Sequence, residues 1–216
     1  MIYLINYDAG NLLSIQRALN YLQFDFLTVN KVDHLSRDDI LLIPGVGSFA
    51  SASERLEKYG LMDLARRNEE HRPFILGICL GMQLFMSEGF EGKRSKGLNL
   101  IEGNVNSIYS LKPKNINIPR TIIGWEDFQL NENLDHRLSW LKDFENNFFY
   151  HVHSYMCLPK KKENIIASYS NELSFIPNII GDLDKRVLGF QFHPEKSGAL
   201  GLNLLKNMID FATKFE

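Results

Sequence analysis

The 216-residue sequence lacks any apolar run near the length of about 20 residues that a membrane-spanning helix requires. It also lacks a basic leader before the strand-like residues 2–6, so we expect a cytoplasmic protein without membrane contact. An excess of one charge is missing as well, because 24 lysines and arginines face 26 aspartates and glutamates. The formal net charge of −2 gives no electrostatic basis for binding nucleic acid.

Cysteine is scarce, which excludes a disulfide scaffold. The sequence has two cysteines, Cys79 and Cys157, and a reducing compartment would keep both as thiols. Cys157 lies in a strand-like segment without a catalytic frame, which predicts a packing residue. Metal-site spacings, internal repeats and Pro- or Ser-rich linkers are also missing. We therefore predict a single domain over residues 1–216 with no metal site.

The first half of the chain alternates between strand and helix patterns. Buried strands are predicted at residues 2–6 and 24–29, within residues 39–49, where the strand ends in a glycine turn, and at residues 73–79. Helices are predicted at residues 11–22, 51–70 and 80–90. This alternation favours an α/β fold, a mostly parallel open sheet flanked by helices, because parallel strands need crossover connections. After about residue 97 the pattern changes to strands and turns, which predicts mixed strands in the second half before a closing helix at residues 201–212.

The segment Gly77-Ile-Cys79-Leu-Gly81 lies between a predicted strand and a predicted helix, where a nucleophile elbow is expected. Such a turn holds its nucleophile in a strained backbone conformation, and flanking glycines let other backbone approach closely. The N-terminus of a helix also favours a thiolate over a thiol. Cys79 is therefore a candidate nucleophile, with a small buried packing residue as the alternative.

A second motif, His193-Pro194-Glu195, follows an apolar strand. In an extended segment, residues two apart point the same way, and proline favours extended geometry before it. Glu195 can then orient the imidazole of His193, which would act as the base for the thiol. The alternative is a surface histidine with a capping glutamate.

The loop Pro44-Gly45-Val46-Gly47 also ends a buried strand, at the same edge of the predicted sheet. Its backbone amides, with the amide of Leu80, are candidate donors for the negative oxygen of a tetrahedral intermediate. An ordinary turn is the competing interpretation. A phosphate-binding loop is disfavoured because no Lys-Ser/Thr follows the glycines.

Together the segments PGVGSF, GICLGMQLF and HPEKSG resemble class I, triad-type glutamine amidotransferases. The resemblance runs essentially end to end, and PGVGSF and HVHSY are most similar to the glutaminase subunits of imidazole glycerol phosphate synthases. It implies a flavodoxin-like three-layer fold and hydrolysis of glutamine without a cofactor. Cys79 would be the nucleophile, His193 the base and Glu195 its orienter. The residues implied around the bound glutamine are Gly47, Leu80, Gln83, Ser154 and Tyr155.

The resemblance also implies a partner, a (β/α)8-barrel cyclase that forms a heterodimer with the glutaminase. Ammonia would pass into the barrel and yield imidazole glycerol phosphate and aminoimidazole carboxamide ribotide in histidine biosynthesis. Asn11 and Trp125 would face this cyclase. The loop from Pro119 to Glu126 departs from the family pattern, being longer and without its usual histidine and asparagine.

Three other functions remain open at this stage. Similar paralogues supply ammonia for amidino modification of bacterial surface sugars, together with a third, amide-forming protein. A stand-alone cysteine hydrolase, such as a peptidase or γ-glutamyl hydrolase, could use the same Cys-His geometry. A non-catalytic binding protein is disfavoured by the intact set of Cys79, His193 and Glu195.

Overall fold

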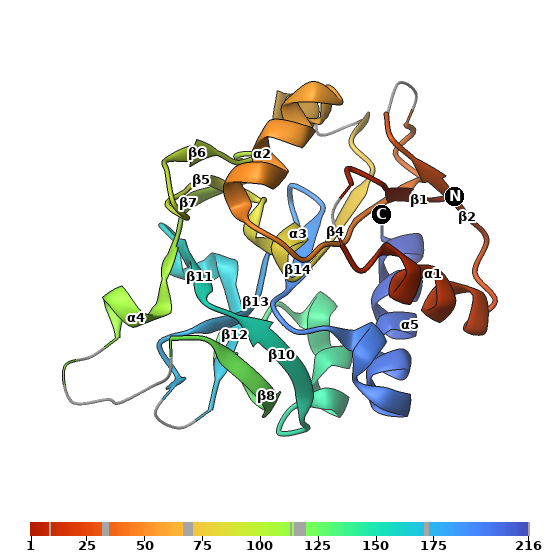
Figure 1. Ribbon diagram of the computed structural model, residues 1–216. Coiled ribbons are helices and arrows are strands. Elements are labelled where there is room, and N and C mark those ends of the chain that lie inside the picture. Colours follow the sequence, from red (N-terminus) through yellow and green to blue (C-terminus); the bar gives the residue numbers. More distant parts are fainter. Residues whose placement is uncertain are drawn as a thin grey trace.

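The computed structural model contains an eight-stranded sheet at its centre (Figure 1). The residues that the structure describes are 1–8, 10–31, 35–66, 71–112, 114, 120–170 and 173–215. In spatial order the strands of this sheet are β2 (Phe26–Val29), β1 (Ile2–Ile5), β3 (Ile40–Ile43), β4 (Phe74–Ile78), β14 (Val187–Phe190), β13 (Pro177–Asp182), β12 (Ile165–Tyr169) and β9 (Phe128–Leu130). The first five are parallel and the rest are antiparallel. The predicted mostly parallel sheet with mixed strands in the second half is confirmed.

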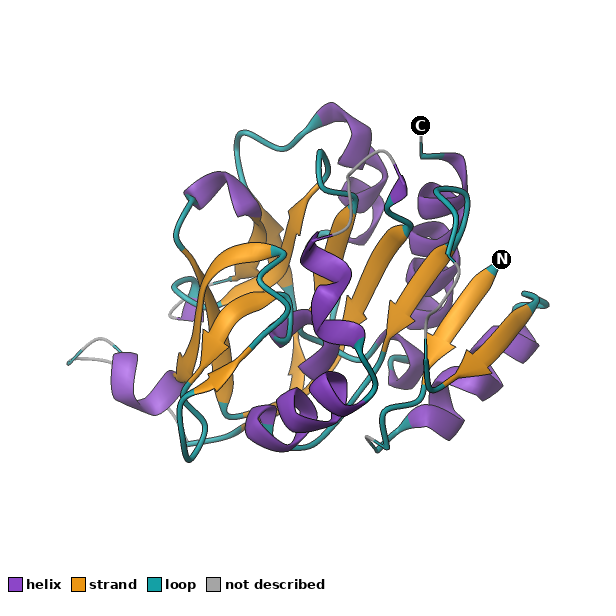
Figure 2. Ribbon diagram, turned by 90° about the horizontal axis from the view of Figure 1, so that it is seen from above, coloured by secondary structure: helices purple, strands orange, loops and turns teal. Residues whose placement is uncertain are grey.

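Helices pack on both faces of this sheet (Figure 2). One face carries α1 (Leu12–Tyr21), α5 (Gly198–Lys214) and the 3-10 segment η3 (His136–Phe144), whose buried residues share one apolar core. The opposite core includes α2 (Phe49–Lys58) and the 3-10 segment η1 (Leu61–Arg66). Strands β3 and β4 are buried along their whole length, as a central sheet between two helical layers requires.

A smaller sheet extends the second core, with the strand order β11 (Tyr155–Pro159), β7 (Ile101–Ser107), β5 (Met86–Gly89) and β6 (Ser95–Lys96). A separate antiparallel pair joins β8 (Ile122–Glu126) to β10 (Phe149–His153). The short helix α4 (Ile108–Leu111) follows β7. In the part of the chain that the structure describes, no helix is long and apolar enough to cross a membrane.

Two helix predictions need correction. The helix predicted at residues 51–70 ends at Lys58, because Gly60 takes a φ of +71° and breaks it before η1; residues 67–70 lie outside the described ranges. The helix predicted at residues 80–90 lasts a single turn, α3 (Leu80–Gln83), and then becomes strand β5. Backbone pairing of β5 with both β6 and β7 overrides the local helical pattern.

Strands β4 and β14 lie side by side, and their parallel pairing is what positions the candidate site. Cys79 follows β4 directly and donates its backbone N–H to the carbonyl of Phe190 at the end of β14, at 2.7 Å. His193 follows a few residues after Phe190. The carboxyl ends of two neighbouring strands thus bring both motifs to one edge of the sheet.

Candidate active site

Cys79 occupies a strained turn between β4 and α3. Its φ of +53° and ψ of −108° lie outside the regions that residues other than glycine usually adopt. A Cβ on Gly81 would lie 1.8 Å from the carbonyl oxygen of Ile43, so only glycine fits there. The elbow geometry expected from the sequence is present, and Cys79 is 5% exposed.

Substitution of Gly81 by alanine is expected to lower the free energy of unfolding by about 3 kcal/mol, because overpacking against backbone cannot be relieved by a rotamer change. Denaturant unfolding would measure the loss. Gly60→Ala is the control, since the Cβ added there meets no atom within 4 Å and only the positive φ of Gly60 opposes the substitution. Equal losses for the two variants would contradict the close approach of Ile43.

His193 and Glu195 form a buried pair beside the elbow. Nδ1 of His193 lies 2.7 Å from Oε1 of Glu195, and both side chains are fully buried. His193 is extended, but Glu195 lies in the 3-10 turn η6 (Pro194–Lys196), so a turn and not a continuous strand brings them together. Asn11 donates from Nδ2 to the same Oε1 of Glu195, a contact that the sequence did not suggest.

Two negative groups determine the charge of His193. Burial lowers the pKa of His193, but the charge of Cys79 and the carboxylate of Glu195 outweigh it and raise that pKa to about 10. Glu195 occupies Nδ1, so the other ring nitrogen, Nε2, is the one that can exchange a proton with Cys79. The arrangement places a protonated imidazole beside Cys79, which is the setting in which a cysteine can act as a nucleophile.

Glu195→Gln is expected to lower the pKa of His193, because the amide keeps the shape of the carboxylate but not its charge. An NMR titration of the imidazole would follow the change. In the wild type the charged pair stabilises the fold fully below the ordinary value of 6.5, and this contribution is lost as the pH rises toward about 10. Glu102→Gln, at an exposed ion pair with Lys160, should leave the titration of His193 unchanged.

The predicted oxyanion donors are not aligned in this conformation. The backbone N–H of Leu80 donates to the carbonyl oxygen of Gly45 at 3.3 Å, so this predicted donor is occupied and the loop presents a carbonyl to it instead of an N–H. The buried hydroxyl of Tyr7 donates to the carbonyl of Pro44 at 2.5 Å and holds the start of the loop. Gly47 has a φ of +136°, a conformation that only glycine adopts readily, so a side chain at this position would be strained.

A cavity of about 450 Å³ opens beside Cys79, within the size range of small-molecule sites. The predicted residues that line it are Val46, Gly47, Cys79, Leu80, Gln83, Ser154 and Tyr155. It is also lined by Glu91, Thr121, Tyr150, Val152, His153 and Lys196, which the sequence did not single out. Asn11 and Trp125 are not among the lining residues; the Trp125 side chain is half exposed and packs edge-on against Tyr150.

Glu91 adds a negative charge to this cavity. Its Oε2 accepts the backbone N–H of Phe49 at the first turn of α2, at 2.6 Å, which fixes the carboxylate. An amino acid carries an ammonium group that such a carboxylate would attract. No sequence motif points to Glu91, because this residue stands in a polar loop after β5.

A buried hydrogen-bonded chain supports the cavity from behind. The hydroxyl of Tyr169 lies 2.5 Å from Nδ1 of His151 and 2.6 Å from Nε2 of His153. Nδ1 of His153 in turn contacts the carbonyl of Tyr155 at 2.8 Å. Burial lowers the pKa of His153 to about 4, so this histidine is neutral near pH 7 and holds the Tyr155 carbonyl as a donor.

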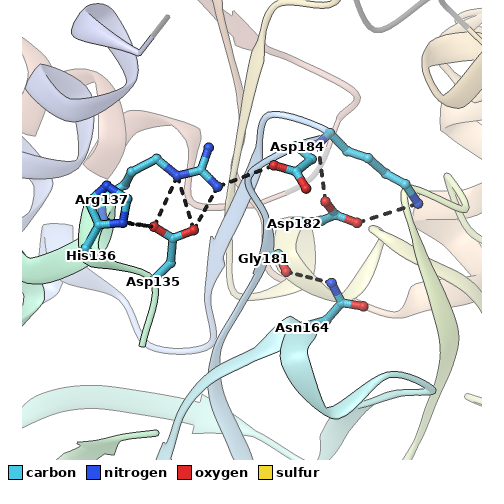
Figure 3. Close-up of polar contacts among 8 residues, drawn as sticks. Asp135, His136, Arg137, Asn164, Gly181, Asp182 and Asp184 are labelled. Atoms are coloured by element: carbon cyan, nitrogen blue, oxygen red, sulfur yellow. Dashed lines mark hydrogen bonds and ion pairs between the residues drawn. The ribbon is translucent and has the colours of Figure 1, made fainter. Parts of the chain in front are cut away.

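A second cavity of about 820 Å³ lies at the other end of β13 and β14. Three of its charged side chains pair with one another, since Arg137 contacts both Asp135 and Asp184 (Figure 3). The neutral amide of Asn164 donates to the carbonyl of Gly181 at 2.9 Å. These contacts tie three loops together. Within the described ranges, no three His, Cys, Asp or Glu side chains gather as a metal site would require.

The chain is similar to known proteins over nearly its whole length. The family model for class-I glutamine amidotransferases matches residues 4–210. Similar proteins include the imidazole glycerol phosphate synthase subunits HisH of Chlorobaculum tepidum, 36% identical over 98% of this chain and 100% of that protein, and of Aquifex aeolicus, 37% identical over 97% and 96%. The corresponding subunit of Methanopyrus kandleri is 33% identical over 98% of both chains.

Solved structures agree on the fold. A crystal structure of a glutamine amidotransferase has a TM-score of 0.67 at 19% identity, covering 98% of this chain and 99% of the other. The structure of PurLQS from Thermotoga maritima has a TM-score of 0.65 at 17% identity and covers 97% of both chains. At these identities the likeness shows a common three-layer α/β architecture.

Proposed function

Since the chain belongs to the class-I glutamine amidotransferase family, we propose that it is the glutaminase subunit of an imidazole glycerol phosphate synthase. It would hydrolyse glutamine to glutamate and ammonia within a single amidotransferase domain. The observation that carries the chemistry is the buried His193–Glu195 pair beside the strained Cys79. The observation that carries the pathway is the full-length similarity to subunits of that synthase.

The proposed reaction proceeds through a thioester. The Cys79 thiolate attacks the side-chain amide carbon of glutamine, and the protonated His193 gives its Nε2 proton to the departing ammonia. Water then attacks the thioester while His193 takes a proton from it, the carbon–sulfur bond breaks, and glutamate leaves. Glu195 holds the imidazole through Nδ1 and stabilises its positive form in both steps.

The cavity beside Cys79 supports glutamine as the substrate. We propose that Glu91 pairs with the α-ammonium group and that the backbone around Ser154 and Tyr155 receives the α-carboxylate. In a peptide, the α-amino or α-carboxyl group of the glutamine residue is part of a peptide bond. Glu91 would then have no ammonium group to pair with, or the backbone would have no carboxylate to bind. This requirement favours free glutamine over the substrates of a stand-alone peptidase.

The partner would be a (β/α)8-barrel cyclase that accepts the ammonia. The pair β8–β10 supports an interface beside the cavity, because Ile123 and Trp125 are exposed on β8 while Tyr150 and Val152 of β10 line the site. Pro119, at the start of the divergent loop, lies outside the described residues. Asn11 would connect this interface to Glu195.

Supply of ammonia for amidino modification of a surface sugar is the second candidate function. The divergent sequence of residues 119–126 favours it, since interface loops select partners. The relatives from Chlorobaculum tepidum, Methanopyrus kandleri and Aquifex aeolicus instead carry the name of the imidazole glycerol phosphate synthase, and this branch is therefore the one we propose.

A coupled assay distinguishes these functions. We expect the chain, mixed with the barrel cyclase of the same genome and its ribulosyl nucleotide substrate, to form imidazole glycerol phosphate from glutamine. Ammonium salts at high pH should replace glutamine and serve as the control for an active cyclase. Product from ammonium salts but none from glutamine would reject the histidine-pathway assignment.

A further inference from the structure

Gln191 is a fully buried residue between β14 and His193 whose side chain reaches the nucleophile. Its Nε2 lies 3.6 Å from Sγ of Cys79, and its Oε1 lies 3.2 Å from Nε2 of Gln83. Its backbone N–H donates to the carbonyl of Asn178 on β13 at 2.8 Å, so both its backbone and its side chain are held by hydrogen bonds. The sequence motifs did not point to this residue, and the proposed reaction assigns it no step.

The direction of these hydrogen bonds follows from one backbone carbonyl. The carbonyl of Tyr155 can only accept, so Gln83 must present its amide nitrogen, at 3.1 Å. The second proton on that nitrogen points to Gln191, which must therefore present its oxygen to Gln83. The amide nitrogen of Gln191 is then left for Cys79. A reversed amide would place two donors together at Gln83 and an oxygen against the sulfur.

From this network we propose that Gln191 is a positioning residue that donates a hydrogen bond to the Cys79 sulfur and favours its thiolate form. The proposal rests on the proposed role of Cys79 as nucleophile. The helix that follows Cys79 contributes little to stabilising a thiolate, because α3 is a single turn and its dipole is small. A hydrogen-bond donor from Gln191 would supply that stabilisation. A hydrogen bond to a charged sulfur is stronger than one to a neutral thiol, so it favours the ionised form.

The same contact assists the second half of the reaction. When water attacks the thioester, the carbon–sulfur bond breaks and the sulfur leaves with the electron pair as a thiolate. The donor on Gln191 stabilises this leaving group. Because Gln83 spends its amide protons on Tyr155 and Gln191, its oxygen remains available to the cavity that it lines.

The test is the pH dependence of Cys79 alkylation by iodoacetamide, followed by mass spectrometry of the Cys79 peptide. In Gln191→Met, which keeps the side-chain length but has no donor, we expect the pH of half-maximal alkylation to rise by about one unit. Burial raises the pKa of the Cys157 thiol, so that residue should not react in the same range. The assay needs no glutamine turnover, so it is independent of the proposed function.

Asn164→Leu is the matched control, because it also removes a buried amide and its hydrogen bond, but at the far end of β13 (Figure 3). Its alkylation profile should equal that of the wild type. Gln191→Glu provides a second variant of the same shape if Gln191→Met does not fold, and it should raise the midpoint further by adding a negative charge. An unchanged midpoint in a folded Gln191 variant would overturn the proposal.

Discussion

Cys79→Ala is expected to lower glutamate release from glutamine by at least about 10⁴-fold, because the variant cannot form the thioester on which the proposed reaction depends. A coupled glutamate dehydrogenase assay would measure the loss. The cavity beside Cys79 should stay intact, since alanine removes only the sulfur from one of its many lining residues. Calorimetry should therefore still detect glutamine binding.

Cys157→Ala is the matched control for this variant. Cys157 is fully buried in the core next to β7 and is absent from the lining of the cavity. Its replacement should cost some stability but leave the rate of glutamate release near the wild-type value. A Cys79→Ala protein that is folded and releases glutamate at the wild-type rate would reject the nucleophile assignment.

The second large effect concerns the partner. Addition of the barrel cyclase is expected to raise the rate of glutamate release by about 10² to 10³-fold, which is the factor that one oxyanion-hole donor typically contributes to a rate. In the isolated chain the Leu80 N–H is bound to the Gly45 carbonyl, so the developing negative oxygen has no free pair of donors. We expect docking to rotate the peptides between Gly45 and Gly47 so that an N–H replaces that carbonyl.

Tyr7→Phe tests the same arrangement without the partner. The hydroxyl of Tyr7 donates to the Pro44 carbonyl, and its removal should free the loop and raise the rate of the isolated chain several-fold. The cyclase should then add a smaller further increase. Equal and high glutamate release by the wild-type chain with and without cyclase would contradict this account of activation.

The fold of the first half could be predicted because local patterns and tertiary packing agree there. Strands β3 and β4 are continuous apolar runs, and burial on both faces of a parallel sheet demands such runs. The elbow could be predicted because Gly77 and Gly81 record close approaches of Phe85 and of the Ile43 backbone. At the buried strands only apolar residues fit, and at the elbow only glycine fits. The residue types in the sequence therefore reveal the structure at these positions.

Other parts depend on contacts between distant segments. Residues 86–89 have a helical pattern but form β5, since strands that follow later in the chain pair with it. Asn11 reaches Glu195 across 184 positions, and Glu91 reaches the cavity from a surface-like loop. The hydrogen bond from the Leu80 N–H to the Gly45 carbonyl depends on the conformation of the loop, and a sequence motif does not specify that conformation. Such features become visible only when the chain is folded.

Covalent labelling by a glutamine-analogue electrophile tests the central claim most directly. Mass spectrometry of the labelled chain should find a single adduct on Cys79, and free glutamine, but not glutamine-containing peptides, should protect it. This result would place glutamine and the nucleophile in one cavity, as the positions of Cys79, Glu91 and Tyr155 suggest. An adduct on another residue, or protection by peptides as strong as that by glutamine, would contradict the assignment.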